Sequence, residues 1–311
     1  MSIIKYGNGA YSSVRFSNRK KVIFFTEPSL TDWTYTTATN GQITLTGYTG
    51  SYDKTIQVPN NGDKYRMNRT CFSNNNSLVS IDLGYSPVVG NSMFSSFSNC
   101  YNLTSVSHIN SSVTKMSFTF HSCTNLNQNI QIPNSVTNMS STFFNCTNLN
   151  QNIQIPNSVT NMSRTFMSCV SLNQNIQIPS SVASMSFAFA SCSNLNQNIQ
   201  IPNSVTNMAS TFQSCNSLNQ NIQIPSSVAD IDYTFFGCTN LQGRINILSE
   251  NIINASDCFS GTLPKDVYIP YNYTGTTERT QTFNSFVSAG YLYANGVSKN
   301  QYGVTVHDLN T

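Results

Sequence analysis

Charged residues are scarce in this chain. Asp, Glu, Lys and Arg make up 9% of the 311 residues, whereas about a quarter of a typical soluble protein is charged. Solubility must therefore rest on neutral polar side chains, and Asn, Ser, Thr and Gln are abundant. Hydrophobic residues still make up 39% and recur at fixed spacing, which favours a packed fold over a disordered chain. The basic run 19–21 is too short for a nucleic-acid-binding stripe, so we expect no nucleic-acid partner.

Long hydrophobic runs are also missing. The first residues, MSIIKYGNGAYSS, lack the apolar core of a secretion signal, and the later run VIFF is too short to be one. No stretch approaches the roughly 20 apolar residues that span a bilayer. These absences predict a protein that is neither inserted in a membrane nor exported by a signal peptide. We expect it to be intracellular or carried out of a cell, for example on a virus particle.

The motifs of common catalytic and metal sites are absent as well. There is no Cys-x-x-Cys pair or His cluster for zinc, and no phosphate-binding loop, Gly-x-Ser-x-Gly or His-Glu-x-x-His motif. Between residues 111 and 229 the only charged side chains are Lys115 and Arg164. The close pair Asp230 and Asp232 fits a solvated turn better than acid–base chemistry. We therefore expect no enzyme, no cofactor and no metal.

What the chain does contain is an internal repeat with a period of about 23 residues, which is typical of solenoids and related arrays. The unit CTNLNQNIQIPNSVTNMSSTFFN begins at Cys123 and returns with few changes, with a looser copy before it and a degenerate copy at the end. Cysteines mark the same position of successive units: Cys100, Cys123, Cys146, Cys169, Cys192, Cys215 and Cys238.

Each unit contains two short extended segments. In the unit from Cys123, Ile130-Gln131-Ile132 alternates like a strand with one buried face, and Pro133 ends it. The segment Val-Thr-Asn-Met that starts at Val136 is the second. One unit cannot bury its apolar side chains alone, but stacked units can, because each side chain then lies on its copy in the next coil. The sequence therefore predicts an all-β-rich solenoid of roughly seven or eight coils.

The repeat resembles that of a known family. Residues 136–149 read Val-Thr-Asn-Met-Ser-x-x-Phe-x-x-Cys-x-x-Leu, which is similar to the BspA-like leucine-rich repeat, as is Ile-x-Ile-Pro-x-Ser-Val-Thr at 130–137. The resemblance covers residues 70–270 and implies a leucine-rich-repeat fold, found in bacterial and protozoan surface proteins and in some phage proteins. In one departure, Leu-x-x-x-Ile-x-Ile has one residue more than the usual Leu-x-x-Leu-x-Leu, which predicts a bulge before the strand.

The seven regularly spaced cysteines are expected to form a structural ladder of stacked thiols, as at the Asn/Cys position of leucine-rich repeats. A buried thiol behaves as a small apolar group with a weak donor, and Asn75 and Thr262 stand at this position in the poorer copies at the two ends. Cys71 and Cys258 fall outside the ladder, each directly before a Phe. We expect all nine cysteines to be free.

Amide side chains form outward rows on the Ile-Gln-Ile segments. These rows are Asn129, Asn152, Asn175, Asn198 and Asn221, and Gln131, Gln154, Gln177, Gln200 and Gln223. They predict amide ladders that stiffen the sheet; glycan binding on this neutral face is the alternative.

Differences between near-identical units indicate where a ligand could bind. One variable column contains Phe118, Ser141, Arg164, Phe187, Ser210 and Tyr233, and another contains His121, Phe144, Met167, Ala190, Gln213 and Phe236. Their mixture of aromatic, basic and small residues is typical of a recognition surface; the alternative is that large residues fill a corner beneath a turn. The candidate binding edge predicted from the sequence is Phe118, Arg164, Phe187, Tyr233, His121, Phe144, Met167, Gln213 and Phe236.

Both ends depart from the repeat. We predict an N-terminal β module at 1–66 that caps the solenoid or attaches it to an assembly, the solenoid at 67–270, and a C-terminal cap or tail module at 271–311. Alternating runs at 21–25 and 42–46 predict strands. Residues 282–290 predict a short helix, and 291–293 and 303–306 predict terminal strands. Aromatic, Gly- and Asn-rich tails after such repeats are similar to those of phage tail and fibre proteins.

These observations predict a virion-associated repeat protein, in a phage tail or fibre, that binds a host-surface glycan or protein. Its further partners would be other virion proteins and copies of itself in a homo-oligomer. A purely structural virion spacer and a cellular surface adhesin stay open as alternatives. The predicted location is the virion, with the cell surface as the alternative.

Overall fold

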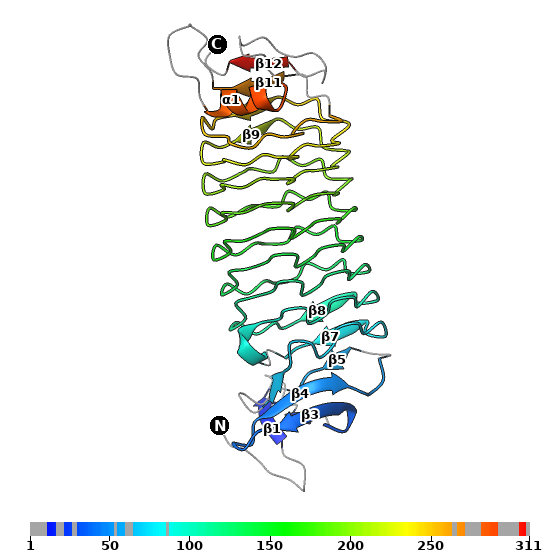
Figure 1. The fold of residues 1–311 in the computed structure, drawn as a ribbon. Coiled ribbons are helices and arrows are strands. Elements are labelled where there is room, and N and C mark those ends of the chain that lie inside the picture. Colours follow the sequence, from blue (N-terminus) through cyan, green and yellow to red (C-terminus); the bar gives the residue numbers. More distant parts are fainter. Residues whose placement is uncertain are drawn as a thin grey trace.

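The computed structural model describes residues 11–16, 22–26, 30–52, 55–59, 65–84, 87–262, 266–270, 281–291 and 305–308. They form a β-solenoid of the leucine-rich-repeat type with little helix, as the sequence predicts, and its about nine turns exceed the seven or eight coils expected. Figure 1 shows a rod of stacked coils, with strands β3 and β4 at one end and helix α1 with strands β11 and β12 at the other.

The N-terminal elements are short strands. Strand β1 (Tyr11–Phe16) pairs antiparallel with β2 (Val22–Thr26). After the 3-10 turn η1 (Leu30–Asp32), strand β3 (Trp33–Thr37) pairs antiparallel with β4 (Ile43–Tyr48), and β4 pairs parallel with β6 (Tyr65–Met67). Strands β2 and β4 coincide with the runs predicted at 21–25 and 42–46.

Two parallel sheets belong to the solenoid. One contains β5 (Ile56–Gln57), β7 (Ser80–Asp82) and β8 (Ser105–Ser107), and the other contains β9 (Ile222–Ile224), β10 (Ile245–Ile247), β11 (Asp266–Ile269) and β12 (Thr305–Asp308). The 3-10 turn η2 (Val89–Asn91) and helix α1 (Gln281–Ser288) complete the elements. Helix α1 matches the helix predicted at 282–290, and β12 overlaps the strand predicted at 303–306. Residues 292 and 293 of the other predicted strand lie outside the described residues.

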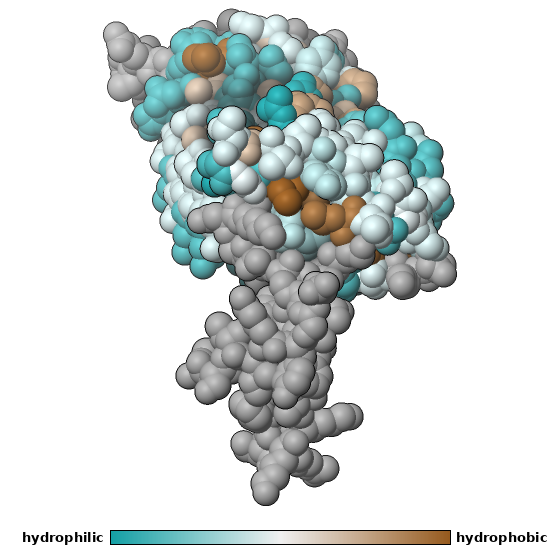
Figure 2. All heavy atoms as spheres, turned by 90° about the horizontal axis from the view of Figure 1, so that it is seen from below, coloured by the Kyte–Doolittle hydropathy of each residue, from teal (hydrophilic) through white to brown (hydrophobic). Residues whose placement is uncertain are grey.

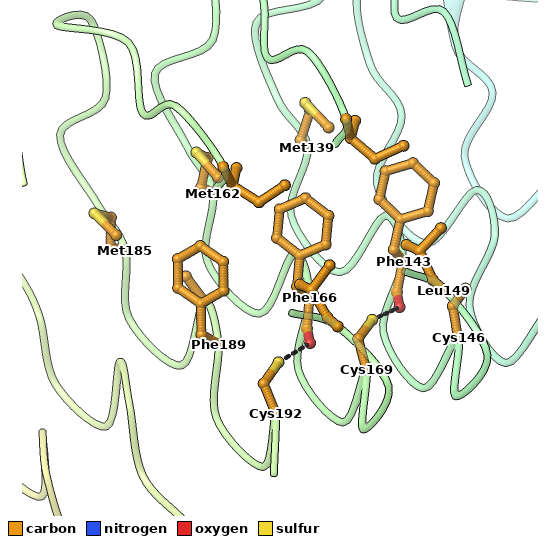
Figure 3. Packing of buried hydrophobic residues seen from close by; sticks show 14 of the residues in the cluster. Met139, Phe143, Cys146, Leu149, Met162, Phe166, Cys169, Met185, Phe189 and Cys192 are labelled. Carbon is orange, nitrogen blue, oxygen red and sulfur yellow. Dashed lines mark hydrogen bonds between the residues drawn. The ribbon is translucent and has the colours of Figure 1, made fainter. Parts of the chain in front are cut away.

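A continuous column of phenylalanines forms the centre of the solenoid. Their stacked ring centroids are 5.5–5.8 Å apart from coil to coil, and every ring is at most 1% exposed. The column consists of Phe72, Phe97, Phe120, Phe143, Phe166, Phe189, Phe212, Phe235 and Phe259. Figure 3 shows three of these rings beside the matching Met and Cys side chains. Identical side chains at identical positions therefore build the core from one layer repeated along the rod.

Both ends of the Phe column are covered by other aromatic side chains. At the N-terminal end, the buried ring of Trp33 in β3 meets Phe72 edge to face at 5.9 Å. At the C-terminal end, the ring of Tyr291 meets Phe259 edge to face at 5.6 Å, and its hydroxyl accepts a hydrogen bond from the Phe259 N–H at 2.8 Å. In α1, the Thr282 hydroxyl donates to the Ser249 carbonyl at 2.6 Å. These contacts satisfy backbone groups that an uncovered terminal coil would leave open.

Buried threonines and cysteines join neighbouring coils. The Thr142 hydroxyl donates to the Met116 carbonyl of the preceding coil at 3.0 Å, and the Cys146 thiol donates to the Phe120 carbonyl at 3.0 Å. Figure 3 marks the same thiol bond for Cys169 and Cys192. All nine cysteines are free, and burial raises the pKa of the ladder thiols, for instance that of Cys100 to about 12. The thiols therefore stay protonated and act as donors near neutral pH.

One buried position is a threonine in most coils, namely Thr119, Thr142, Thr165, Thr211 and Thr234. Ala188 stands at this position in the coil between Thr165 and Thr211, and it is fully buried. Replacing Ala188 by Thr is expected to raise the unfolding free energy by about 1 kcal/mol, because the new hydroxyl can donate to the Met162 carbonyl as its neighbours do to theirs. Chemical denaturation of the wild type and Ala188→Thr measures the change. Ala188→Val, which adds similar volume without a donor, is the control; equal stability of the two variants would contradict the expected hydrogen bond.

One prediction about the coils is wrong in detail. Strands are expected in every Ile-Gln-Ile segment, but the segments 130–132, 153–155, 176–178 and 199–201 form none, and only the copy at 222–224 is a strand, β9. The continuous parallel ladder lies instead on the Val-Thr-Asn-Met side, through bridges that join Ser92, Lys115, Asn138, Asn161, Ser184, Asn207, Asp230 and Asn254 in turn.

The spacing between the Leu and the residue that begins the Ile-x-Ile segment differs between these coils. In the coils of β7 and β8 the Leu and the strand residue are three apart, as in Leu78 and Ile81, and these strands pair. In the regular repeats the Leu and the first Ile are four residues apart, as in Leu126 and Ile130, and a Gln lies midway between them. Gly243 replaces that Gln in the coil of β10, where an added Cβ would lie 2.1 Å from the Gln220 carbonyl oxygen. Only a glycine therefore allows the close approach that lets β10 pair with β9.

Candidate binding edge

The first variable column occupies a left-handed backbone position. Phe118, Arg164, Phe187 and Tyr233 have φ of 57°, 58°, 57° and 54°. The local sequence supports the turn where an Asn or Asp precedes it by three residues, because that side chain accepts a backbone N–H; Asn138 Oδ1, for example, accepts from Ser140 at 2.9 Å. The turn is closed between coils, where the Ser141 N–H donates to the Ser163 carbonyl at 2.9 Å.

The residue types in this column are not those that the backbone prefers. A second left-handed column contains Asn99, Ser122, Asn145, Ser168, Ser191, Ser214 and Gly237, all small residues. A left-handed position costs about 1–2 kcal/mol for an ordinary side chain and is unusual for a bulky one. Ser141 and Ser210 show that a small residue also fits the first column. Its Phe, Tyr and Arg side chains are therefore not required by the turn.

The two predicted columns lie side by side along one edge of the solenoid. The Phe118 ring is 5.9 Å from the His121 ring, and His121 stacks on Phe144 at 4.8 Å. Further along, Tyr233 lies 5.8 Å from Phe236. Burial lowers the pKa of His121, so its ring is neutral near pH 7 and stacks as an uncharged aromatic.

Exposure along this edge is uneven. Phe118 and Tyr233 are 38% and 40% exposed, whereas Ser141 and Ser210 are 2% and 4% exposed. Arg164 is exposed, and its guanidinium lies 4.9 Å from the centre of the half-buried Phe187 ring. Of the other predicted residues, Met167, Gln213 and Phe236 are half-buried. In the coils of residues 118, 164, 187 and 233, the first column therefore carries a large side chain that is exposed or half-buried.

Sequence reasoning missed one member of this edge, Phe94. It is 43% exposed, and its ring centroid is 5.7 Å from that of Phe118. It stands in the column that contains Ser117 and Ser140 in later coils, so its departure from Ser was the available signal. The Arg69 guanidinium, from the same column one coil earlier, lies 6.0 Å from the centre of the Phe94 ring. We call Phe94, the four large residues of the first column, His121 and Phe144 the aromatic edge.

The amide ladder runs through Asn127 and its copies, two residues before the predicted Asn row, and through the Gln that follows each copy. Asn127 Oδ1 accepts from the Asn150 backbone at 2.9 Å and from Gln151 Nε2 at 3.1 Å, and the pattern repeats on Asn150, Asn173 and Asn196. In the predicted rows, Gln200 donates to Asn198 of its own coil at 2.9 Å.

The described residues contain neither a cluster of metal ligands nor a helix that could cross a membrane. Over that part of the chain, no group of three or more His, Cys, Asp or Glu side chains could hold a metal ion. Among the helices that the structure describes, none has the length and apolarity to span a bilayer. Viewed from the N-terminal end, the described surface is mainly neutral or hydrophilic, with small hydrophobic areas (Figure 2).

Two known families match parts of the solenoid. Residues 162–285 match the family described as BspA type Leucine rich repeat region, in six copies, and residues 91–178 match the family described as Mycoplasma protein of unknown function, DUF285. Residues 162–285 of the solenoid are therefore similar to leucine-rich repeats of the BspA type.

Solved structures of bacterial proteins resemble the solenoid. A leucine-rich repeat protein from Bacteroides ovatus ATCC 8483 has a TM-score of 0.57 at 22% identity, covering 76% of this chain and 69% of that one. The T. pallidum leucine rich repeat protein has a TM-score of 0.49 at 21% identity, covering 62% and 91%. A leucine rich cell surface protein from Faecalibacterium prausnitzii A2-165 has a TM-score of 0.32 at 18% identity, covering 84% and 97%. The first likeness shows a shared fold. No curated protein matches this chain.

Proposed function

We propose that this chain is a non-enzymatic binding scaffold, displayed at a surface, whose aromatic edge contacts the ligand. One observation carries the proposal: Phe118, Arg164, Phe187 and Tyr233 occupy left-handed positions where the coil accepts Ser. Bulky side chains at such positions are costly to the fold. Aromatic and Arg side chains are also those that dominate binding energy at protein interfaces. Selection for contact with a ligand accounts for both facts.

The repeats resemble those found in bacterial surface proteins, so a surface adhesin is our first candidate. Display on a phage tail or fibre is the second, and the resemblance of the non-repeat ends to tail proteins supports it. In either setting we propose a host or neighbouring-cell glycan or protein as the partner, with other virion proteins and further copies of this chain as additional partners in the second. A spacer without ligand is the competing function that the experiment must exclude.

Adsorption of the labelled protein to intact bacterial cells tests the proposal. A variant with Phe118, Arg164, Phe187 and Tyr233 all changed to Ser takes the residue that the column already has at Ser141 and Ser210, so its fold is expected to persist. Saturable adsorption by the wild type is expected to fall at least about tenfold in this variant, the loss of only about 1.4 kcal/mol of binding energy.

A matched control changes four residues on another face, Asn152, Asn175, Gln154 and Gln177, to Ser. It is expected to adsorb like the wild type, with unchanged circular dichroism in both variants. Full adsorption by the edge variant, or no saturable adsorption by the wild type to any cell, would favour the spacer.

A further inference from the structure

The N-terminal end of the aromatic edge borders a hollow of about 750 Å³, within the size range of small-ligand sites. It is open on one side and lies where β6 leads into the first coils. Its lining residues are Asn68, Arg69, Thr70, Val89, Gly90, Ser92, Phe94 and Lys115.

The charge in this hollow has one sign. Arg69 and Lys115 are both exposed, and none of the lining residues is acidic. A guanidinium and an ammonium that line the same hollow favour a carboxylate, which Arg can bind through two parallel hydrogen bonds. Asn68, Thr70 and Ser92 supply amide and hydroxyl groups beside the cations, as a ligand with several hydroxyls requires.

Aromatic rings accompany the cations. Phe94 lines the hollow, the Phe118 ring lies 5.7 Å from that of Phe94, and both rings are more than a third exposed. The negative face of an aromatic ring attracts the positively polarised C–H groups on the apolar side of a pyranose. An acidic peptide would also match the cations, but exposed rings among hydroxyl and amide groups fit a sugar ring better. The His121 and Phe144 pair extends this surface by one more coil.

We propose that this hollow binds a uronic-acid oligosaccharide, with Arg69 and Lys115 on a carboxylate and Phe94 and Phe118 against the sugar rings. The inference rests on the proposed function and names the ligand class for one end of the same edge. Neighbouring coils supply a substitution for every residue involved: Ser for Arg69 and Phe94 as in Ser117 and Ser140, Asn for Lys115 as in Asn138, and Ser for Phe118 as in Ser141.

Isothermal titration of the full chain with trigalacturonate, and with maltotriose as the neutral counterpart, tests the proposal. Trigalacturonate is expected to bind at least about tenfold tighter than maltotriose, and its affinity is expected to fall as salt is raised from about 50 to about 500 mM, because ion pairs at the surface are screened. Lys115→Asn and Phe94→Ser are each expected to weaken binding at least about fivefold. Gln177→Ser, at an exposed residue on another face of the solenoid, is expected to leave the affinity for trigalacturonate unchanged.

Three outcomes would overturn the proposal. They are equal binding of the two sugars, binding that Lys115→Asn and Phe94→Ser both leave intact, and binding of a hexaglutamate peptide as tight as that of trigalacturonate. The cell-adsorption experiment separates this failure from failure of the scaffold function. Adsorption that depends on the aromatic edge, without trigalacturonate binding, would retain the function and reject the ligand class.

Discussion

Deletion of residues 147–169 is expected to give a folded protein that is one coil shorter. The deletion removes one complete repeat unit and joins Cys146 to Val170, so that Val170, Ser171 and Leu172 take the places of Thr147, Asn148 and Leu149. The Phe143 ring would then stack on that of Phe189. The Met, Cys and Leu columns would also continue without a gap. Because each coil contacts only its neighbours, the loss should lower the melting temperature without abolishing cooperative unfolding.

A smaller deletion is expected to do more damage. Removing residues 147–158 takes away the side of one coil that contains Leu149 and Ile153, and the remainder of that coil, 159–169, cannot close a turn. Circular dichroism and the rate of thiol labelling distinguish the two proteins, since the ladder cysteines are fully buried in the native state. We expect slow labelling of the first protein and rapid labelling of several thiols in the second. Equal behaviour of the two deletions would contradict the stacked-coil arrangement.

Replacement of Phe166 by Ala is expected to lower the unfolding free energy by about 3–5 kcal/mol, the usual cost of removing a buried aromatic ring. Phe166 is fully buried, and its ring lies 5.6 Å from both Phe143 and Phe189. The variant therefore loses two ring contacts as well as buried area, and the cavity lies in the middle of the rod. Urea denaturation followed by circular dichroism measures the change.

Phe166→Leu separates the two contributions. It keeps most of the apolar volume and loses the ring stack, so its cost is expected to be about 1.5 kcal/mol or less. A further readout is the labelling of Cys169 and Cys192, which flank this layer: both should label faster in Phe166→Ala than in the wild type. Wild-type stability of Phe166→Ala would show that the Phe column does not hold the coils together.

The columns of the solenoid could be predicted from the sequence because the repeat period is visible in the constant spacing of the cysteines. Once Cys recurs at a constant interval, the positions of Met139, Phe143 and Leu149 in the core follow from stacking alone, and the structure buries all three completely. The short helix near the C-terminus could be predicted for a local reason, since Gly290 follows it with φ of 85°.

The side of the coil that carries the parallel ladder could not be predicted. Alternation in Ile-Gln-Ile indicates a strand, but pairing also depends on how closely two coils approach, which the segment itself does not encode. That effect becomes visible only beside Gly243, where the added Cβ would collide with the preceding coil. The close packing of Phe94 with Phe118 was hidden for a similar reason, because only coil-to-coil distances reveal it.

The left-handed backbone of the first column was equally hidden. Gly237 in the second column hints at positive φ, but nothing in Phe118 or Arg164 does, since neither residue favours that conformation. The turn is set by the residue that precedes it and by bonds between coils. The sequence was therefore enough to place the variable residues on one edge. The free-energy cost of their left-handed backbone conformation could be recognised only in the structure.

The hydrogen bonds between coils also determine how the rod responds to tension. Bonds such as that from the Met139 N–H to the Asn161 carbonyl join one coil to the next, so a pull on the two ends of the rod loads successive layers in series and opens them one at a time. A closed coil contributes about 5 Å of length, but the same stretch of chain reaches about 75–80 Å when extended. A rod of this construction can lengthen manyfold under tension while its remaining coils stay folded, and so absorb mechanical work.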